Sequence, residues 1–334
     1  MQRVILGATG MSVSPIALGT MTFGDQVDPE ASSALLDLAV DRGINFLDTA
    51  NSYNAGRTEQ IIGRWLKARG GRHDLVIASK VRYRVGDDPE SDGLSPKVVV
   101  QQLENSLKRL ETDYLDICFI HQPDDDTPIE TTWRCLDALV ATGRVHCLGL
   151  SNFAAWQIVE IIHLARARGW TPPTVTQFLY NTISRGVENE LLPMTDAYGL
   201  GTCAYNPLAG GLLTGKHRAG QEAVPESRLA VNTGYRDRYW NDRQRAAAER
   251  VVDIAREGGR TPVELALRFL LDHSAVNVAL IGATSSTQLD ENVSALDKSA
   301  LTPDEARGLS KAWAELHGPA PRYNRDNRSG PGRR

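Results

Sequence analysis

The sequence predicts an α/β fold, a single closed (β/α)8 barrel of the TIM type. Eight short apolar runs alternate with stretches of helical periodicity along the 334 residues, and composition does not change between them. An open doubly wound sheet with an added domain is the alternative. It is disfavoured because no strand leads into a G-x-G-x-x-G turn: the turn over 7–11 lacks that glycine spacing and the following helix.

An N-terminal β-hairpin around Gly10 is expected first, with apolar residues at 4–6 and at Val13. Strands are then expected at 16–18, 44–48, 75–80, 114–121, 145–150, 175–178, 201–205 and 276–281. Helices are expected between them at 31–39, 59–68, 95–110, 129–141, 154–166 and 187–198. Gly43 and Gly143 each follow a helix, where a C-terminal glycine is typical.

The connection after the seventh strand is the least regular part of the chain. Residues 206–239 contain glycines and no clear periodicity, so we expect a long functional loop. Further helices are expected at 244–255, 263–271, 286–296 and 303–316, the last of them as C-terminal additions. We therefore predict a barrel domain over 1–317 and a flexible tail over 318–334, which is rich in Pro, Gly, Asn and Arg.

Composition and charge argue against several classes of protein. The formal net charge is -4 without a basic excess, which argues against nucleic-acid binding. No apolar run approaches the ~20 residues that span a bilayer, and no signal peptide opens the chain, so we expect no membrane association and a cytoplasmic location. The four cysteines and seven histidines show no ligand spacing, so neither disulfides nor a metal site are expected.

Polar side chains end several predicted strands, on the face that points into the barrel. Because side chains alternate along a strand, Asp48, Lys80 and His121 each end an inward row that is otherwise apolar. In the next three predicted strands, the inward rows end in the same way with Ser151, Gln177 and Tyr205. Loops at the carboxyl ends of parallel barrel strands converge, so we expect one site there.

Each of these residues also has an ordinary structural explanation. Asp48 could cap a loop, Tyr53 could be a wall of the barrel mouth, and His121 could be a core histidine. Lys80 could lie on the surface just past its strand, but its register points it inward. A buried lysine needs an anion, and Asp48 is available. The functional explanation is favoured because the pattern repeats from strand to strand.

Asp48, Tyr53, Lys80 and His121 together suit the delivery of a proton to an oxygen that becomes negative. A tyrosine keeps its proton at neutral pH, and a nearby lysine cation is expected to lower its pKa. Asp48 would hold Lys80, and the imidazole of His121 would orient the oxygen and stabilise its charge. A carbonyl that receives hydride is such an oxygen, and a nicotinamide held by the remaining strand ends would supply the hydride.

Short motifs along the chain occur in the order and spacing of a known family. They are 19–24 (GTMTFG), 48–50 (DTA) with Tyr53, 79–80 (SK), 120–121 (IH), 149–153 (GLSNF), Gln177, 205–208 (YNPL) with 211–216 (GLLTGK), and 282–283 (GA) with 288–289 (QL) and 291–292 (EN). On these motifs the chain resembles the aldo-keto reductases over nearly its whole length. The resemblance implies an NADP(H)-binding barrel with a catalytic tetrad of Asp48, Tyr53, Lys80 and His121.

The resemblance also implies where an extended NADP(H) would bind. Thr20, Met21 and Asp48 would lie near the nicotinamide ribose, next to Gly19; Ser151, Asn152 and Gln177 would hold the carboxamide, and Tyr205 would stack on the ring. Asn206, Pro207, Leu208, Ala209, Gly210 and Lys216 would line the pyrophosphate, with Arg228 as a further phosphate partner. Gly282, Thr284, Gln288, Glu291 and Asn292 would face the adenosine.

One part of the cofactor site departs from the family pattern. Several members place a Lys or Arg at the adenosine 2′-phosphate, where this chain has Gly282, Thr284 and Gln288. Hydroxyl and amide donors bind phosphate less strongly than a guanidinium does. NADP(H) is the favoured cofactor and NAD(H) the alternative.

We predict NADPH-dependent reduction of an aldehyde or ketone to an alcohol, with Tyr53 as the proton donor. The motif over 151–156, with Thr132 and Trp133, also resembles bacterial members that act on sugars, so a sugar or nucleotide-linked deoxysugar of secondary metabolism is an alternative substrate. An alternative of another class is a non-catalytic, cofactor-sensing regulatory subunit, like the potassium-channel β subunits that resemble this family.

The partner is expected to be a small-molecule carbonyl compound in a pocket made by the loops. The expected walls are Met21, Phe23, Tyr53, Tyr83, Gln122, Tyr239 and Trp240, of which the last two could equally anchor a loop. The identity of the carbonyl compound, the physiological direction and the oligomeric state stay open.

Overall fold

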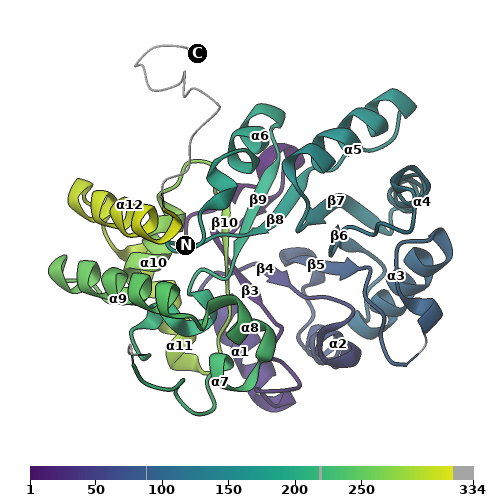
Figure 1. The fold of residues 1–334 in the computed structure, drawn as a ribbon. Helices are drawn as coiled ribbons and strands as arrows, with labels where there is room; N and C mark the ends of the chain where they lie inside the picture. Colours follow the sequence, from purple (N-terminus) through teal and green to yellow (C-terminus); the bar gives the residue numbers. More distant parts are fainter. Residues whose placement is uncertain (88, 218–219, 319–334) are drawn as a thin grey trace.

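Eight parallel strands close into a barrel in the computed structural model, which describes residues 1–87, 89–217 and 220–318 (Figure 1). The strands are β3 (Ile16–Gly19), β4 (Phe46–Asp48), β5 (Val76–Val81), β6 (Leu115–Ile120), β7 (Val145–Ser151), β8 (Val175–Leu179), β9 (Gly201–Tyr205) and β10 (Val278–Ile281). Each strand pairs with the next, and β10 closes the barrel by pairing with both β9 and β3. Helices lie around the outside, so the predicted (β/α)8 fold is confirmed.

The predicted N-terminal hairpin is also present, as β1 (Val4–Ile5) paired antiparallel with β2 (Ser12–Val13). Leu6 and Val13 are fully buried among the side chains of the barrel interior. Gly7 approaches the start of β9 so closely that a Cβ there would lie 2.1 Å from the Gly201 nitrogen, and its φ of +51° also favours glycine. The hairpin therefore covers the amino end of the barrel.

Apolar side chains fill the barrel interior below the strand ends. They come from alternate positions of the strands: Ala17, Phe46, Val76, Ala78, Ile117, Phe119, Val175, Cys203, Val278 and Leu280. The ring of Phe119 fits because its neighbour on β7 is Gly149, where a Cβ would lie 2.4 Å from that ring. A second and larger hydrophobic core lies between the strands and the surrounding helices.

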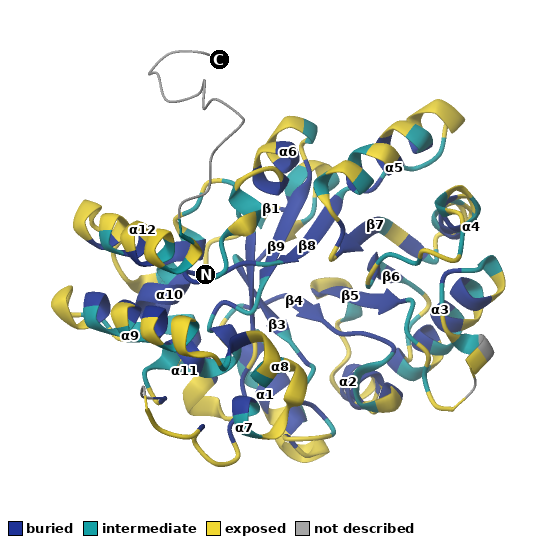
Figure 2. Cartoon of the chain, in the orientation of Figure 1, coloured by how far each residue is buried: buried dark blue, intermediate teal, exposed yellow. Residues whose placement is uncertain are grey.

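The helices bury one face against the barrel and expose the other to solvent (Figure 2). They are α1 (Pro29–Asp41), α2 (Arg57–Arg69), α3 (Pro96–Leu110), α4 (Ile129–Ala141), α5 (Ala155–Arg168), α6 (Leu191–Tyr198), α9 (Asp242–Glu257), α10 (Pro262–Leu271), α11 (Ser286–Ser294) and α12 (Pro303–His317). In the part of the chain that the structure describes, none of the helices has both the length and the apolar character needed to cross a membrane.

The long connection after the seventh barrel strand is present, and it contains helical segments that periodicity did not indicate. They are η6 (Ala209–Thr214), α7 (Arg228–Val231) and α8 (Thr233–Tyr239). These segments are too short for a period of 3.6 residues to show in the sequence. The predicted flexible tail over 318–334 lies, apart from Gly318, outside the described residues.

Candidate active site

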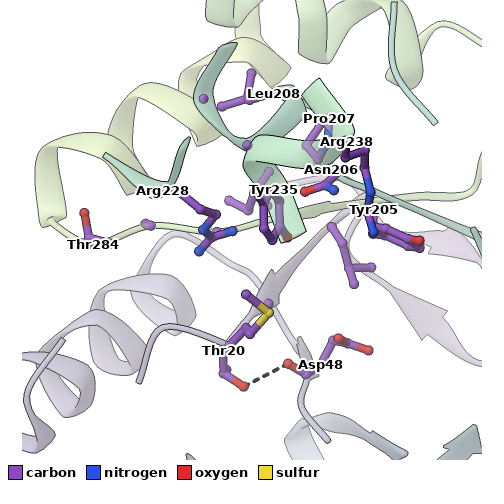
Figure 3. Close-up of a pocket in the computed structure, with 18 of the residues that line it drawn as sticks. Thr20, Asp48, Tyr205, Asn206, Pro207, Leu208, Arg228, Tyr235, Arg238 and Thr284 are labelled. Atoms are coloured by element: carbon purple, nitrogen blue, oxygen red, sulfur yellow. Dashed lines mark hydrogen bonds between the residues drawn. The ribbon is translucent and has the colours of Figure 1, made fainter. Parts of the chain in front are cut away.

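A cavity of about 1190 Å³ lies at the carboxyl ends of the barrel strands (Figure 3). Its lining includes the last residues of several strands, among them Gly19, Asp48 and Tyr205. Of the residues that the sequence assigns to catalysis or cofactor binding, all line this cavity except Lys80 and Ala209. The structure thus brings residues from the whole length of the chain to one place.

Lys80 lies behind the cavity wall, 1% exposed, with three oxygens around its ammonium group. Lys80 Nζ lies 2.7 Å from Asp48 Oδ2, 2.8 Å from the Thr49 carbonyl oxygen and 3.2 Å from the Tyr53 hydroxyl. The other carboxylate oxygen of Asp48 accepts a hydrogen bond of 2.8 Å from Gln177 Nε2. A buried cation and a buried carboxylate therefore compensate each other, as the inward register of the two strands predicts.

Tyr53 opens a tight turn whose next two residues have left-handed backbone. φ is 49° at Asn54 and 54° at Ala55, values that cost conformational energy in residues with a Cβ. The Asn54 side chain offsets part of this cost, because its Nδ2 donates to the carbonyl oxygens of Met21 at 3.0 Å and Phe23 at 2.8 Å. The turn is thereby fixed to the loop after β3, and with it the position of Tyr53.

Burial and charge set the protonation states of Tyr53 and Lys80. Burial raises the pKa of the Tyr53 phenol above its ordinary value, and the Lys80 cation opposes this rise without cancelling it. The sequence predicted the effect of the lysine alone; the net direction is the opposite, because the effect of burial on the phenol outweighs that of the lysine. Burial lowers the pKa of Lys80, but the Asp48 carboxylate and Tyr53 outweigh it, so the pKa is raised and the ammonium stays charged.

His121 faces the cavity as a neutral imidazole. Burial, together with the nearby cations of Lys80 and Arg82, lowers its pKa to about 3. Its Nδ1 is buried and finds no hydrogen-bond partner among the described residues. Its ring meets that of Tyr53 edge-on, with the centroids 5.9 Å apart. A neutral imidazole in this place can contact a ligand oxygen without competing for the phenol's proton.

Ser151, Asn152 and Tyr205 form a hydrogen-bonded chain beside these residues. The Tyr205 hydroxyl donates to Asn152 Oδ1 at 2.7 Å, and Asn152 Nδ2 donates to the His121 carbonyl oxygen at 2.9 Å and to Ser151 Oγ at 3.1 Å. Asn152 has a φ of 63°, which asparagine tolerates better than most residues. An aromatic ring, a side-chain amide and a hydroxyl therefore lie together in the cavity lining, which suits a planar, amide-bearing ring.

Arg228 lines the part of the cavity away from Asp48 and Tyr205 (Figure 3), and the carboxylates of Glu226 and Glu291 also belong to the lining. Lys216 and Arg228 both line the cavity, and neither forms an ion pair with another described residue. Burial and the charge of Arg228 lower the pKa of Lys216. Asn206 Nδ2 is buried there and is also unpartnered among the described residues. Two uncompensated cations and a free amide donor fit a polyanion such as a pyrophosphate.

Polar groups of the loop after β10 and the start of α11 line the far part of the cavity. The backbone nitrogen and the hydroxyl of Thr284 donate to Gln288 Oε1 at 3.0 and 3.1 Å, and Asn292 Nδ2 donates to the Gly282 carbonyl oxygen at 3.3 Å. Glu291 lines the cavity beside them. Nowhere in the described residues do three or more His, Cys, Asp or Glu side chains cluster so that they could hold a metal ion.

Besides Lys80, four residues that the sequence assigned to the site do not line the cavity. Ala209, Phe23 and Tyr239 are fully buried in the outer hydrophobic core, and Trp240 packs partly buried against it. The Tyr239 hydroxyl is held by Asn181 Nδ2 at 3.3 Å. The prediction that Phe23, Tyr239 and Trp240 form pocket walls was therefore wrong, because all three are directed into packing contacts. Met21, Tyr53, Tyr83 and Gln122 do line the cavity.

Sequence reasoning missed Tyr235 and Arg238, which reach the cavity from α8 (Figure 3). The Tyr235 ring lies between two guanidinium groups, 5.0 Å from that of Arg228 and 5.5 Å from that of Arg238. Its Cδ1 would lie 2.7 Å from a Cβ on Gly210, so the glycine is needed for this approach. No sequence signal could have found these residues, since the connection over 206–239 lacks a period that orients its side chains.

The chain is similar to proteins of one family. The model described as Aldo/keto reductase family matches residues 15–314. Aflatoxin B1 aldehyde reductase member 2 of Rattus norvegicus is 37% identical over 323 residues, which cover 92% of this chain and 87% of that protein. A probable voltage-gated potassium channel subunit beta of Oryza sativa subsp. japonica is 37% identical over 315 residues, covering 91% and 94%. An uncharacterized oxidoreductase of Bacillus subtilis (strain 168) is 36% identical over 310 residues, covering 89% and 91%.

Proposed function

The chain belongs to the aldo/keto reductase family, and we propose that it reduces an aldehyde or ketone to an alcohol with NADPH, using Tyr53 as the proton donor. Membership makes it an oxidoreductase and confirms the resemblance seen in the sequence. The observation that carries the proposal is the position of Lys80 Nζ, 3.2 Å from the Tyr53 hydroxyl and 2.7 Å from Asp48 Oδ2, at the edge of the cavity. This geometry supports a phenol that gives up its proton only when an oxyanion forms beside it.

The cavity fits a nicotinamide dinucleotide. Tyr205, Asn152 and Ser151 offer a ring and amide-binding groups near Tyr53, and the uncompensated cations near Arg228 offer a place for phosphates. A bound nicotinamide would supply the hydride that a carbonyl carbon needs. Lys216 and Arg228 suit the phosphates that NADPH and NADH share, so the choice of NADPH over NADH rests on the family.

The residues of the chain would then move one proton. The Tyr53 hydroxyl gives its proton to the carbonyl oxygen as the carbon is reduced, and the Lys80 ammonium stabilises the phenolate that remains. Asp48 keeps Lys80 charged and in place. His121, neutral and facing the cavity, holds the carbonyl oxygen near the phenol. Positioned proton transfer of this kind contributes roughly 10²–10⁴-fold to rate.

The relatives favour two functions, and the site decides our choice between them. One relative is named as an aldehyde reductase, which supports an aldehyde as substrate. Another is named as a probable potassium channel subunit, which supports a cofactor-sensing regulatory role. The assembled Asp48, Tyr53, Lys80 and His121 favour turnover, since cofactor binding alone does not need a phenol held against a buried lysine.

The test is NADPH oxidation by purified protein with a panel of aldehydes and ketones. We expect turnover by the wild type, and a fall in kcat of roughly 10²–10⁴-fold in Tyr53→Phe with the Kd for NADPH little changed. Tyr198→Phe is the matched control, because it removes a hydroxyl that contacts His163 on the outer helices. Near-normal turnover by Tyr53→Phe would overturn the assigned donor. NADPH binding without turnover across the panel would favour the regulatory role.

A further inference from the structure

The backbone leaves its usual conformations at Arg82, immediately after β5. Its φ is 132°, a value that residues with a Cβ rarely adopt and that costs conformational energy. Arg82 comes two residues after Lys80 and directly before Tyr83, which lines the cavity. Such a conformation persists only where surrounding contacts hold it, so the contacts that hold it indicate what the strain is used for.

Gln102 on α3 supplies those contacts. Its side chain is buried, 4% exposed, and it does not line the cavity. Gln102 Oε1 accepts a hydrogen bond of 2.7 Å from the Arg82 backbone nitrogen, and its Nε2 donates to the carbonyl oxygens of Ser91 at 2.6 Å and Tyr83 at 3.2 Å. Asn51 Nδ2 binds the same Tyr83 carbonyl oxygen at 2.8 Å from the other side. The backbone on either side of Arg82 and Tyr83 is therefore fixed from α3 and from the turn after β4.

The fixed backbone at Arg82 and Tyr83 sets the Tyr83 ring against His121. The two rings meet edge-on, with the centroids 5.0 Å apart and the planes at 71°. The Tyr83 hydroxyl donates to Gln122 Oε1, and both residues line the cavity. They follow β5 and β6, whereas the residues assigned to the cofactor follow β3, β4 and β7 to β10. Tyr83 and Gln122 thus form a wall beside His121, on the side left for the substituents of a carbonyl compound.

We propose that Gln102 is a positioning residue for substrate selection, which holds Tyr83 against His121 and so limits the size of the group that the carbonyl carbon can carry. This inference rests on the proposed carbonyl reduction at the same site. Because the wall is fixed by hydrogen bonds from the buried Gln102 side chain to the backbone, it excludes bulky substituents more strongly than a tyrosine on a free loop would. A substitution of Gln102 that loosens the backbone at Arg82 and Tyr83 should widen the pocket without changing any residue that lines it.

The test compares kcat/KM for a bulky aryl aldehyde, 2-naphthaldehyde, with that for propanal. The ratio of the two values does not depend on how much of the enzyme is folded, so a purely structural defect leaves it unchanged. We expect Gln102→Ala and Tyr83→Ala each to raise the ratio at least tenfold. The double variant should add little to either, because both act on one wall. Gln101→Ala, the same change at the exposed neighbour, is the matched control.

An unchanged ratio in Gln102→Ala, with a raised ratio in Tyr83→Ala, would overturn the positioning role of Gln102. Unchanged ratios in both variants would also overturn the claim that Tyr83 forms a wall that limits substrate size. Should Gln102→Ala not fold, Gln102→Glu keeps an acceptor for the Arg82 amide but loses both N–H donors, and its ratio decides in the same way. Should the wild type reduce no aldehyde or ketone at all, the proposed function fails. Hydrogen exchange of the Arg82 backbone amide then tests this inference. If Gln102→Ala leaves the protection of that amide unchanged, Gln102 does not hold the backbone at Arg82 and the inference is overturned.

Discussion

His121 gives a stability test of the electrostatics at the barrel mouth, because its imidazole is neutral far below its ordinary pKa. Burial, with Lys80 and Arg82 nearby, lowers that pKa from 6.5 to about 3. The unfolded chain takes up the proton near pH 6.5, and the folded chain only near pH 3, so acid favours the unfolded state. The part of the free energy of unfolding that depends on a neutral His121 is therefore fully present above pH 6.5 and is lost as the pH falls toward 3.

The size of the effect follows from the shift. One pKa unit corresponds to about 1.4 kcal/mol, so the whole shift is worth about 5 kcal/mol once the pH is below 3. At pH 5 the unfolded imidazole is almost fully protonated and the folded one is not, which amounts to about 2 kcal/mol. The variant His121→Asn has no titrating group at this position. Its pH dependence should therefore lack this part and keep the contributions of His217 and His273, whose pKa values burial also lowers.

Urea unfolding followed by tryptophan fluorescence at pH 7 and at pH 5 measures the difference. Between these pH values the wild type should lose about 2 kcal/mol more free energy of unfolding than His121→Asn does. His163→Asn, the same change at an exposed position on α5, is the control. Equal losses in the wild type and in His121→Asn would refute the reasoning that the folded protein keeps this imidazole neutral.

Three further results are expected. Lys80→Met leaves the Asp48 carboxylate buried without a cation, so the free energy of unfolding should fall by about 3–5 kcal/mol and turnover should be lost; a stable, active variant in urea and rate assays would contradict this. Ala55→Gly relieves left-handed backbone and should raise the free energy of unfolding by up to about 1 kcal/mol, whereas a decrease would show that the turn is unstrained. Lys216→Met should raise the Kd for NADPH roughly tenfold or more in a fluorescence titration, less so at high salt, and an unchanged Kd would place the phosphates elsewhere.

The sequence predicts best what the strands dictate. Asp48, Lys80 and His121 were found because side chains alternate along a strand with a period of two, which fixes the ones that point into a barrel. This alternation still holds at or next to the ends of the strands, where these residues lie. The structure brings all three together at the mouth, with Lys80 and Asp48 2.7 Å apart. Tyr53 lies beyond the strand, in a turn with left-handed residues that no period describes, and it was assigned from its chemistry and its place five residues after Asp48.

The contacts that no local pattern encodes could not be predicted. Gln102 is separated from Arg82 by twenty positions, and its role depends on an unusual φ and on the way α3 packs beside β5. Tyr235 reaches the cavity because Gly210 leaves room for its ring, a fit between two segments without periodicity. The pKa of Tyr53 was missed for a related reason, since its burial depends on the assembled cavity and not on the neighbouring charges in the sequence.

The charges around Tyr53 determine when a proton can leave. Lys80 and Asp48 neutralise each other, so the pair imposes little net field on an empty site, while burial keeps the proton on Tyr53 and off His121. Without a negative oxygen in the cavity, neither Asp48 nor His121 readily accepts the phenol's proton. When such an oxygen develops beside the hydroxyl, proton transfer places the negative charge on the phenolate, 3.2 Å from the lysine ammonium. The lysine therefore stabilises the state after transfer more than the state before it, which is the condition for an interaction that speeds the step.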